Sequence, residues 1–410
     1  MKRWLSVVGI GEDGLAGLAP AARTLVDTAE ILVGGARHLA MVPENVAESV
    51  AESVAERFVW DRPLERTIAA IAARRGKRVT VLASGDPLWH GVGATLLRRF
   101  PREEMTVLPQ PSAFSLAAAR LGWPLAECAA ISLHARPLDG LHLHLAPNRR
   151  ILALAEDSDT PRRVARMLTE SGWGASRLVV LGYMGGPREA AVAATAREWG
   201  ERQAADLSTL AIECRAGPGA RAWSRLAGLP DDAFEHDGQL TKREIRAATL
   251  AALAPLPGET LWDIGAGCGS IAIEWLRAAE NSRAFAVERD PVRAAIIARN
   301  AAALGVPALD IVVGAAPEPL AGLPPPNAIF VGGGIAAPGL LPALWAALPA
   351  GGRLVANSVT TAGEAVLIDW QARHGGALTR IAVSRAEPVG RHRLWRPLPP
   401  VTQLAVGKAS

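Results

Sequence analysis

Two acidic residues and three glycines form the most suggestive chemical pattern of the chain. Asp263 closes an apolar run, glycines follow at 265, 267 and 269, and Glu288 closes the next apolar run. Glycines allow a tight turn and the close approach of a ligand, because no Cβ stands in the way. A carboxylate about twenty residues beyond such a turn can accept hydrogen bonds from ribose hydroxyls. The pattern predicts a site for a cofactor that contains a nucleoside.

A second glycine pattern lies at the N-terminus, where Gly9, Gly11 and Gly14 follow an apolar strand. This spacing suggests a dinucleotide-binding oxidoreductase. However, Glu30 precedes the second strand instead of ending it, and Pro20 delays the helix that would bind a pyrophosphate. We expect a tight turn beside a different ligand and keep a nicotinamide oxidoreductase as an alternative.

Other reactive side chains are isolated in the sequence. The three cysteines, Cys128, Cys214 and Cys268, are far apart, which predicts neither a disulfide framework nor a metal cluster and fits the cytoplasm. Cys268 has no base suggested nearby, so we interpret it as a small turn residue. His142 and His144 alternate with leucines in a strand-like run, but no third metal ligand is indicated. We predict no metal site.

Composition limits the partners of the protein. The chain has 410 residues and a net charge of +4, with arginines spread through predicted helices. A nucleic-acid surface normally shows a basic stripe, and a spanning helix needs 18 or more apolar residues. The sequence shows neither feature, so we expect no nucleic-acid partner and no membrane span.

Strands and helices alternate along the chain, which predicts an α/β protein with mostly parallel strands up to about residue 215. Residues 216–236 are rich in glycine and proline and predict a linker. A second α/β series occupies 237–410, with strands at 260–264, 283–288 and 309–313 and helices at 242–253, 269–279 and 291–304. A tandem Val-Ala-Glu-Ser repeat at 46–53 predicts an exposed helix without chemistry.

The first half resembles the tetrapyrrole methylase family. The resemblance lies in Val7–Gly11, Ala83–Pro87, Pro109–Ser112 and Ser132–Pro137, although the family usually continues Gly-Pro-Gly where this chain has Gly11-Glu12-Asp13. It implies two α/β subdomains and S-adenosylmethionine (SAM) between them. It also implies that Gly85 and Asp86 shape the cofactor loop, and that Ser112 and Ser115 offer polar contacts.

The second half resembles the class I SAM-dependent methyltransferases, whose fold is Rossmann-like. Gln239–Arg246 ahead of the glycine turn, with Gly314–Glu318 and Phe330–Gly334, narrows the resemblance to the decarboxylating methyltransferases of the corrin pathway. The resemblance implies that the following residues contact SAM: Thr241, Gly265, Ala266, Gly267, Cys268, Gly269, Glu288 and Ala316. The family commonly has an acid after Gly314, where this chain has Ala315.

The order of the two halves resembles the bifunctional decarboxylating precorrin methyltransferases of cobalamin biosynthesis. The resemblance implies conversion of precorrin-6B to precorrin-8X: methylation at C-5 by the first half, and methylation at C-15 with decarboxylation of the C-12 acetate chain by the second. One SAM site is expected in each half. Because arginine binds both oxygens of a carboxylate, we predict that Arg136 and Arg246, with His134, bind the tetrapyrrole.

Other functions stay open at this point. Both folds also serve methyltransferases of RNA or protein, so these substrates are alternatives. A tetrapyrrole carrier without activity is a further alternative, because the loop at Gly11–Asp13 differs from the family pattern. The sequence leaves the oligomeric state open, a homo-oligomer included, and identifies no catalytic proton donor.

Overall fold

The structure is a computed structural model that describes residues 3–43, 56–61 and 63–409. The predicted repeat at 46–53 therefore lies outside the described residues. Contacts divide the chain into two compact units, one formed by Met1–Arg136 and Ala146–Arg221, the other by Pro137–Leu145 and Ala222–Ser410. Each unit is described by itself.

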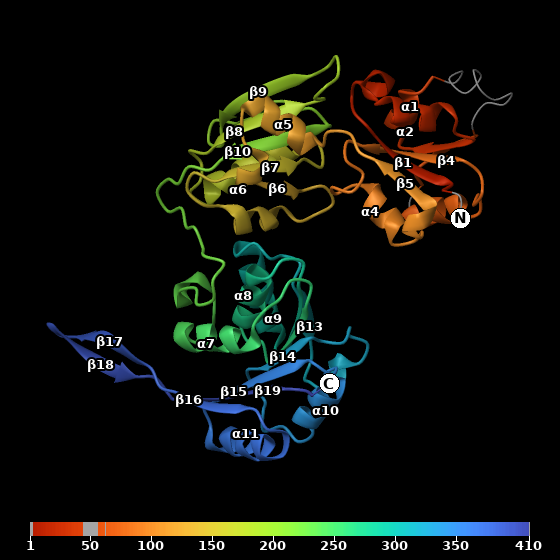
Figure 1. Ribbon diagram of the computed structural model, residues 1–410. Helices are drawn as coiled ribbons and strands as arrows, with labels where there is room; N and C mark the ends of the chain where they lie inside the picture. The colour runs from red at the N-terminus through yellow and green to blue at the C-terminus, as the bar shows by residue number, and fades with distance from the viewer. Residues whose placement is uncertain (1–2, 44–55, 62, 410) are drawn as a thin grey trace. The chain divides into compact units, whose positions relative to one another are not determined.

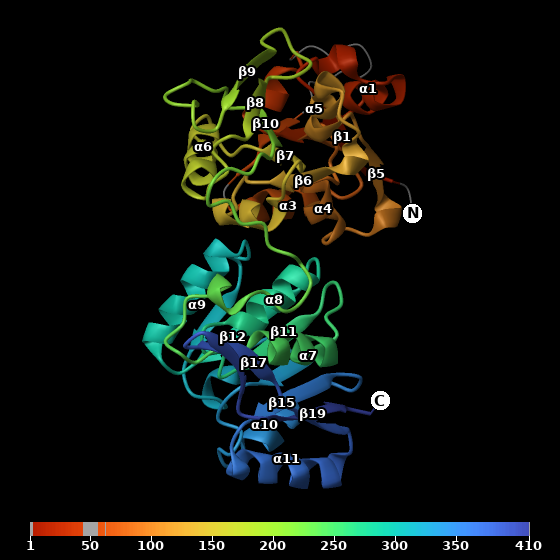
Figure 2. The ribbon, with the colours of Figure 1, turned by 90° about the vertical axis from the view of Figure 1, so that its left-hand side faces the viewer.

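The first unit begins with a five-stranded parallel sheet in the order β3-β2-β4-β1-β5 (Figure 1). Its strands are β1 (Leu5–Ile10), β2 (Ile31–Gly34), β3 (Glu56–Val59), β4 (Val79–Ser84) and β5 (Met105–Leu108). Helices α1 (Pro20–Asp27) and α2 (Ala36–Ala40) cover one face, and α3 (Leu64–Ala72) and α4 (Val92–Leu97) cover the other (Figure 2). The adjacent Val7 and Val8 are therefore both fully buried, as a parallel sheet covered on both faces requires.

The second sheet of this unit has the order β6-β7-β10-β8-β9. Its strands are β6 (Cys128–Ser132), β7 (Arg150–Leu154), β8 (Arg177–Gly182), β9 (Ala190–Thr195) and β10 (Ser208–Glu213). The β6–β7 pair is parallel and the other three pairs of this sheet are antiparallel, so the predicted parallel pairing holds for most strand pairs of this half but not for this sheet. For β8 and β9 the physical reason is connection length, because the short loop between them allows only antiparallel pairing. Helix α5 (Ala113–Leu121) packs on this sheet.

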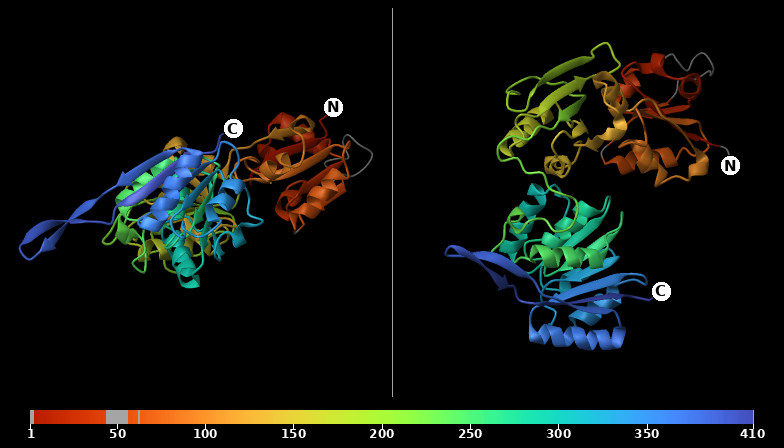
Figure 3. Two further views of the ribbon diagram at one scale, coloured as in Figure 1. Left: turned by 90° about the horizontal axis from the view of Figure 1, so that it is seen from below. Right: turned by 60° about the vertical axis from the view of Figure 1, so that its left-hand side comes forward.

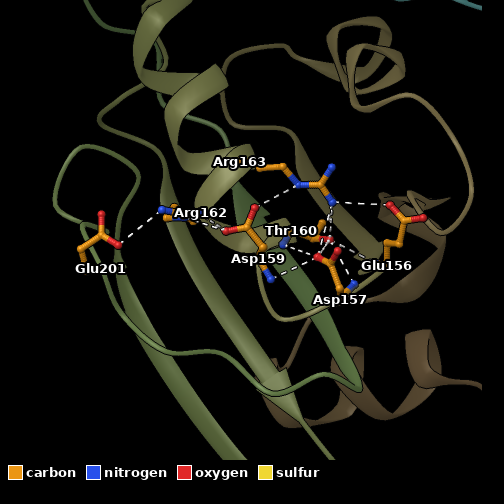
Figure 4. A network of polar contacts seen from close by, with 7 residues as sticks. All are labelled: Glu156, Asp157, Asp159, Thr160, Arg162, Arg163 and Glu201. Atoms are coloured by element: carbon orange, nitrogen blue, oxygen red, sulfur yellow. Dashed lines mark hydrogen bonds and ion pairs between the residues drawn. The ribbon is translucent and has the colours of Figure 1, made fainter.

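A polar network fixes the start of helix α6 (Thr160–Glu170) in the first unit (Figure 4). Asp157 Oδ1 accepts the Thr160 N–H at 2.8 Å and the Thr160 hydroxyl at 2.7 Å, and Arg163 approaches the same carboxylate at 3.4 Å. The Thr160 side-chain hydrogen bond is the main cause that lowers the pKa of Asp157. These residues line neither of the cavities described below, so the network serves the fold.

The second unit has a seven-stranded sheet in the order β13-β12-β11-β14-β15-β19-β16. The strands are β11 (Thr260–Ile264), β12 (Arg283–Glu288), β13 (Asp310–Val313), β14 (Ala328–Val331), β15 (Arg353–Ser358), β16 (Ala377–Ile381) and β19 (Val401–Gly407). Helices α7 (Arg243–Leu253), α8 (Ser270–Ala278) and α9 (Pro291–Ala303) cover one face, and α10 (Leu340–Ala347) and α11 (Thr361–His374) cover the other (Figure 1). The strand order reverses between β11 and β14, which is where a doubly wound sheet binds its ligands.

Two further segments complete the second unit. Strands β17 (Ser384–Val389) and β18 (His392–Pro397) form a hairpin that projects from it (Figure 3). Residues Leu138–His144 form a 3-10 helix, so the prediction of a strand-like run at His142 and His144 is wrong. Pro137 and Gly140 interrupt a strand there.

The predicted α/β fold class is confirmed: two five-stranded sheets in the first unit are followed by a Rossmann-like, doubly wound sheet in the second. No helix among the described residues is long and apolar enough to cross a membrane.

Candidate active sites in the two units

In the first unit, the end of β1 and the loop after β4 touch through two glycines. A Cβ added to Gly9 would lie 1.9 Å from Gly85 O, so the two backbones approach as no other residue would allow. Gly85 itself has φ +52°, in the left-handed region that favours glycine. The Gln110 N–H, after β5, donates to Gly85 O at 3.1 Å. The carboxyl ends of three strands are thus fixed against one another.

These loops border a cavity of about 590 Å³. Of the residues predicted for this half, Gly85, Asp86, Ser112, His134 and Arg136 line it. The cavity is also lined by apolar residues of the second sheet, which include Leu154 and Leu181. The structure therefore gathers predicted cofactor and substrate residues around one space.

The predicted residues of this cavity have different surroundings. Asp86 Oδ1 accepts the Leu88 N–H at 2.8 Å, so this carboxylate also shapes its own turn. Ser115 lies outside the lining, and its N–H donates to Ser112 Oγ at 3.1 Å. His134 and Arg136 are exposed at the cavity, and the Arg136 guanidinium forms no hydrogen bond or ion pair with any residue that the structure describes.

Sequence reasoning missed a polar cluster in the same lining. Arg37 pairs with Glu12 and donates to Ser84 Oγ at 3.0 Å, and His38 Nε2 lies 3.0 Å from the same hydroxyl. Burial, with the neighbouring Arg37 charge, lowers the pKa of His38 to about 4, so the imidazole is neutral near pH 7. Ser84 ends β4, and the other three residues follow the carboxyl ends of β1 and β2. That position was the signal that could have found them.

In the second unit, the glycines of the predicted turn all adopt positive φ. The values are +69° for Gly265, +61° for Gly267 and +81° for Gly269. A Cβ on Gly269 would lie 2.8 Å from Ile297 Cγ2, so this glycine is also needed where α8 approaches α9. The turn is therefore built from glycine for conformation and for packing.

Glu288 is buried beside this turn. Its Oε2 accepts the Gly267 N–H at 2.8 Å, and its Oε1 accepts the Asp290 N–H at 3.0 Å. Each oxygen keeps a lone pair for a further donor. The structure thus joins the acid and the glycine turn that the sequence separates by twenty-one positions.

The turn borders a cavity of about 430 Å³. Among the predicted cofactor residues, Thr241, Gly265, Ala266, Gly267 and Cys268 line it. Gly269, Glu288 and Ala316 lie outside the lining. Burial raises the pKa of the Cys268 thiol, which agrees with a small turn residue and not a thiolate nucleophile.

Asp263 is the penultimate residue of β11, just before the turn, and is buried. Its Oδ2 accepts the Ala272 N–H at 3.1 Å, whereas Oδ1 has no partner among the described residues. Burial raises the pKa of this carboxyl to about 7, and the Glu288 charge acts in the same direction. Asp263 therefore ties β11 to α8 and holds a proton more tightly than an ordinary aspartate.

Arg246, predicted to bind a carboxylate of the tetrapyrrole, is buried among partners from the protein itself. The side chain is 0% exposed, and its guanidinium binds Glu274 Oε1 at 2.6 Å and the Thr241 carbonyl at 2.5 Å. Asp231, at 3.3 Å, and the Leu229 carbonyl occupy its other donors. A substrate carboxylate would have to displace these partners, so the geometry argues against the predicted carboxylate binding. Arg246 instead holds the segment that carries Thr241.

Five polar residues of this cavity were missed: Gln239, Lys242, Ser270, Asn357 and Ser358. Lys242 is adjacent to the predicted Thr241, and Asn357 and Ser358 end strand β15. A rule that examines every strand's carboxyl end would have found Asn357 and Ser358. The described residues include no group of three metal-ligating side chains that could hold an ion, and all three cysteines are free.

Comparison with known proteins gives each half a family. Residues 5–199 match the model of the tetrapyrrole (corrin/porphyrin) methylases, and residues 232–408 match that of the precorrin methyltransferase domain. The chain is 50% identical over 400 residues to the precorrin-6Y C(5,15)-methyltransferase (decarboxylating) of Sinorhizobium sp, a match that covers 98% of this chain and 95% of that protein. The chain belongs to the precorrin-6Y C(5,15)-methyltransferase (decarboxylating) family. It is a methyltransferase.

Shorter relatives each match less than half of this chain. The cobalt-precorrin-7 C(5)-methyltransferase of Salmonella typhimurium is 35% identical, covering 43% of this chain and 83% of that protein. The probable cobalt-precorrin-6B C(15)-methyltransferase (decarboxylating) of Pyrobaculum aerophilum is 34% identical, covering 42% and 92%. A crystal structure of the C-terminal domain of the Rhodobacter capsulatus precorrin-6Y C5,15-methyltransferase is 46% identical, covering 45% and 99%, with a TM-score of 0.43.

The oxidoreductase alternative is not supported for this family member. Helix α1 begins at Pro20, so its N-terminus does not adjoin Gly9, Gly11 and Gly14. Strand β2 ends at Gly34, and the acid Glu30 precedes the strand and accepts the Arg78 N–H. A dinucleotide site would need an acid at the end of this strand.

Proposed function

We propose that the chain converts precorrin-6B to precorrin-8X in cobalamin biosynthesis, with SAM as methyl donor at one site in each half. The N-terminal half methylates C-5, and the C-terminal half methylates C-15 and removes carbon dioxide from the C-12 acetate chain. One observation carries the proposal: a chain of this family holds two separate cavities, each bordered by a glycine-built loop at the carboxyl ends of parallel strands. The two shorter relatives, named for one methylation each, support this division.

The proposed domains are residues 1–215 and 237–410, with a linker at 216–236. The C-terminal domain then contains the whole seven-stranded sheet, and the N-terminal domain contains both five-stranded sheets. A homo-oligomeric state and a cytoplasmic location stay predictions.

The residues that line the C-terminal cavity, together with Glu288 and Ala316 outside its lining, fit SAM. Glu288 keeps lone pairs for two ribose hydroxyls, and the positive-φ glycines leave room for the methionine portion beside Thr241, Ala266 and Cys268. Ala316, beyond strand β13, is proposed near the adenine. SAM, when bound, supplies a methyl group from a sulfonium, and the leaving thioether is neutral. The protein therefore has to align the reactants and exclude water.

The N-terminal cavity is proposed to hold a second SAM and the macrocycle. Gly85, Asp86, Ser112 and Ser115 would form the cofactor side. Arg136, which is exposed and unpaired among the described residues, offers a fork to a substrate carboxylate, and His134 offers a further donor. Because the nucleophile is an electron-rich bridging carbon of the macrocycle, no catalytic triad is needed.

For the decarboxylation in the C-terminal half, the conjugated ring of the macrocycle can accept the electrons that are released.

The experiment uses the full chain with methyl-labelled SAM and offers precorrin-6B or bulk RNA. Mass spectrometry should show two added methyl groups and the loss of one carbon dioxide from the tetrapyrrole. Labelled RNA with an unlabelled tetrapyrrole would instead favour the RNA alternative. A protein that binds the tetrapyrrole tightly but transfers no methyl group would favour the carrier.

A further inference from the structure

Three polar side chains meet behind the C-terminal cavity. Thr249 belongs to α7, Asn357 to β15 and Gln403 to β19. Asn357 Nδ2 donates to Thr249 Oγ1 at 2.9 Å, and Gln403 Nε2 donates to Thr249 Oγ1 at 3.1 Å and to Asn357 Oδ1 at 2.9 Å. Thr249 and Gln403 are buried, whereas Asn357 reaches the cavity lining. A buried polar cluster of this kind is costly unless its groups are paired.

The hydrogen-bond inventory fixes how Asn357 is oriented. The Thr249 hydroxyl donates to the Ile245 carbonyl at 2.8 Å, so its lone pairs only accept. Asn357 must therefore present its NH₂ group to Thr249 and its oxygen to Gln403. One N–H of Asn357 then has no partner among the described residues. The cluster leaves a fixed donor on a side chain that lines the cavity.

The position of Asn357 separates it from the proposed cofactor residues. Glu288 ends β12, on one side of the reversal between β11 and β14, and Asn357 lies near the end of β15, on the other side. Ligand parts in a doubly wound sheet lie on both sides of such a reversal. The nucleoside of SAM is assigned to the strands on the Glu288 side of the reversal. The strands on the Asn357 side are therefore left for the tetrapyrrole.

One charged side chain lines the same cavity. Lys242, immediately before α7, is half-buried, and it is the only ionisable acid or base of the lining apart from the Cys268 thiol. Its ammonium group has no ion pair or hydrogen bond with any residue that the structure describes. The cavity therefore offers a fixed N–H donor and one unneutralised positive charge, which together suit a carboxylate.

We infer that Asn357 donates its remaining N–H to a carboxylate of the tetrapyrrole, that Lys242 supplies the matching charge, and that Gln403 acts as a positioning residue by holding the Asn357 amide. This inference rests on the proposed function. The bound group is a side-chain carboxylate that stays on the macrocycle. A donor that held the departing carboxylate would stabilise the ground state, because that group loses its charge as carbon dioxide forms.

The test measures C-15 methylation, C-5 methylation and SAM affinity in one full-length protein. For Asn357→Ala and Lys242→Met we expect KM for the precorrin in C-15 methylation to rise about 10- to 100-fold, the value of one hydrogen bond to a charged group. SAM affinity and C-5 methylation should stay at the wild-type level. Gln403→Met keeps the Asn357 donor but frees its orientation, so its rise in KM should be smaller.

Two controls separate binding from folding. Asn357→Asp keeps the shape but removes the donor and repels a carboxylate, so its KM should rise at least as far as that of Asn357→Ala. Gln371→Met alters a half-buried amide of α11, which lies outside the cavity lining, and should change neither KM nor SAM affinity. Lys242→Met lies outside the buried cluster, which keeps the test valid if Asn357→Ala does not fold.

Three outcomes would overturn the inference. If KM is unchanged in both Asn357→Asp and Lys242→Met while the wild-type protein is active at C-15, the inference is overturned and the proposed function still stands. Loss of SAM affinity that matches the rise in KM would assign the two residues to the cofactor. Wild-type protein without C-15 activity on the precorrin would overturn the proposed function and, with it, this inference.

Discussion

The Gly267 N–H donates a hydrogen bond of 2.8 Å to Glu288 Oε2. This bond links the turn after β11 to the end of the neighbouring strand β12, which pairs with β11 in parallel. The conformation of the glycine turn and the position of the carboxylate are therefore coupled. A change at Glu288 affects both the ribose acceptor and the loop that faces the methionine portion of the cofactor.

Glu288→Ala should abolish C-15 methylation and decarboxylation but spare C-5 methylation. The variant removes the ribose acceptor and leaves two backbone N–H groups, of Gly267 and Asp290, without their acceptor. Mass spectrometry of the product is the measurement, and Glu280→Ala, an exposed residue shortly after α8, is the control. Loss of both methylations in a folded variant would contradict independent domains.

Arg136→Met should raise KM for the precorrin in C-5 methylation by about 10- to 100-fold, because one hydrogen bond to a charged carboxylate is lost. Affinity for SAM should not change. Initial rates at varied precorrin concentration give the value, with Arg166→Met on the exposed face of α6 as control. A loss confined to SAM affinity would place Arg136 on the cofactor side instead.

Local patterns were sufficient for the core of the C-terminal fold. The strand at 260–264, the helix near 269–279 and the strand at 283–288 were predicted to within one residue. Glycine at 265, 267 and 269 fixes the turn, and alternation of strand and helix fixes the parallel pairing. These features depend on neighbouring residues, which a single sequence displays directly.

The misplaced and missed residues depend on partners far away in the sequence. Arg246 faces inward because Glu274, on the next helix, neutralises it there, and no local pattern shows that pairing. Asn357 gains its significance from Thr249 and Gln403, which are distant in sequence. Arg37 likewise meets Glu12 only once β1 and β2 have taken their places in the sheet.

Arg246→Met should destabilise the protein by about 3–5 kcal/mol, since removing one partner leaves the buried charge of Glu274 uncompensated. Urea unfolding measures the change. Because Glu274 also accepts the N–H groups of Gly228 and Leu229, the double variant with Glu274→Gln should recover only part of it. Arg299→Met, which breaks an exposed pair with Glu235, should have little effect. If the Arg246→Met protein is as stable as the wild type but binds precorrin more weakly, Arg246 binds the substrate as the sequence predicted.

Asp263 should make stability depend on pH, with a sign opposite to that of a salt-bridged acid. Its pKa in the folded protein is about 7, above the ordinary value of 3.8, because the carboxyl is buried. The unfolded chain therefore loses the proton first. The stability contribution is complete below pH 4, falls as the pH rises towards 7, and is lost above that value. The loss should reach about 4 kcal/mol, because the pKa rises by about three units and each unit is worth about 1.36 kcal/mol.

The variant Asp263→Asn isolates this contribution, because the amide has nearly the same shape and cannot ionise. Urea unfolding gives the free energy of unfolding at pH 5 and at pH 8. The difference between these two free energies should be smaller in the variant than in the wild type. Asp310→Asn, an exposed aspartate of β13 paired with Arg283, should retain the wild-type difference. If Asp263→Asn also retains the wild-type difference in the free energy of unfolding, the carboxyl of Asp263 is already ionised in the folded protein near neutral pH. Its unpaired oxygen would then require a donor, because a buried negative charge without one is too costly to persist.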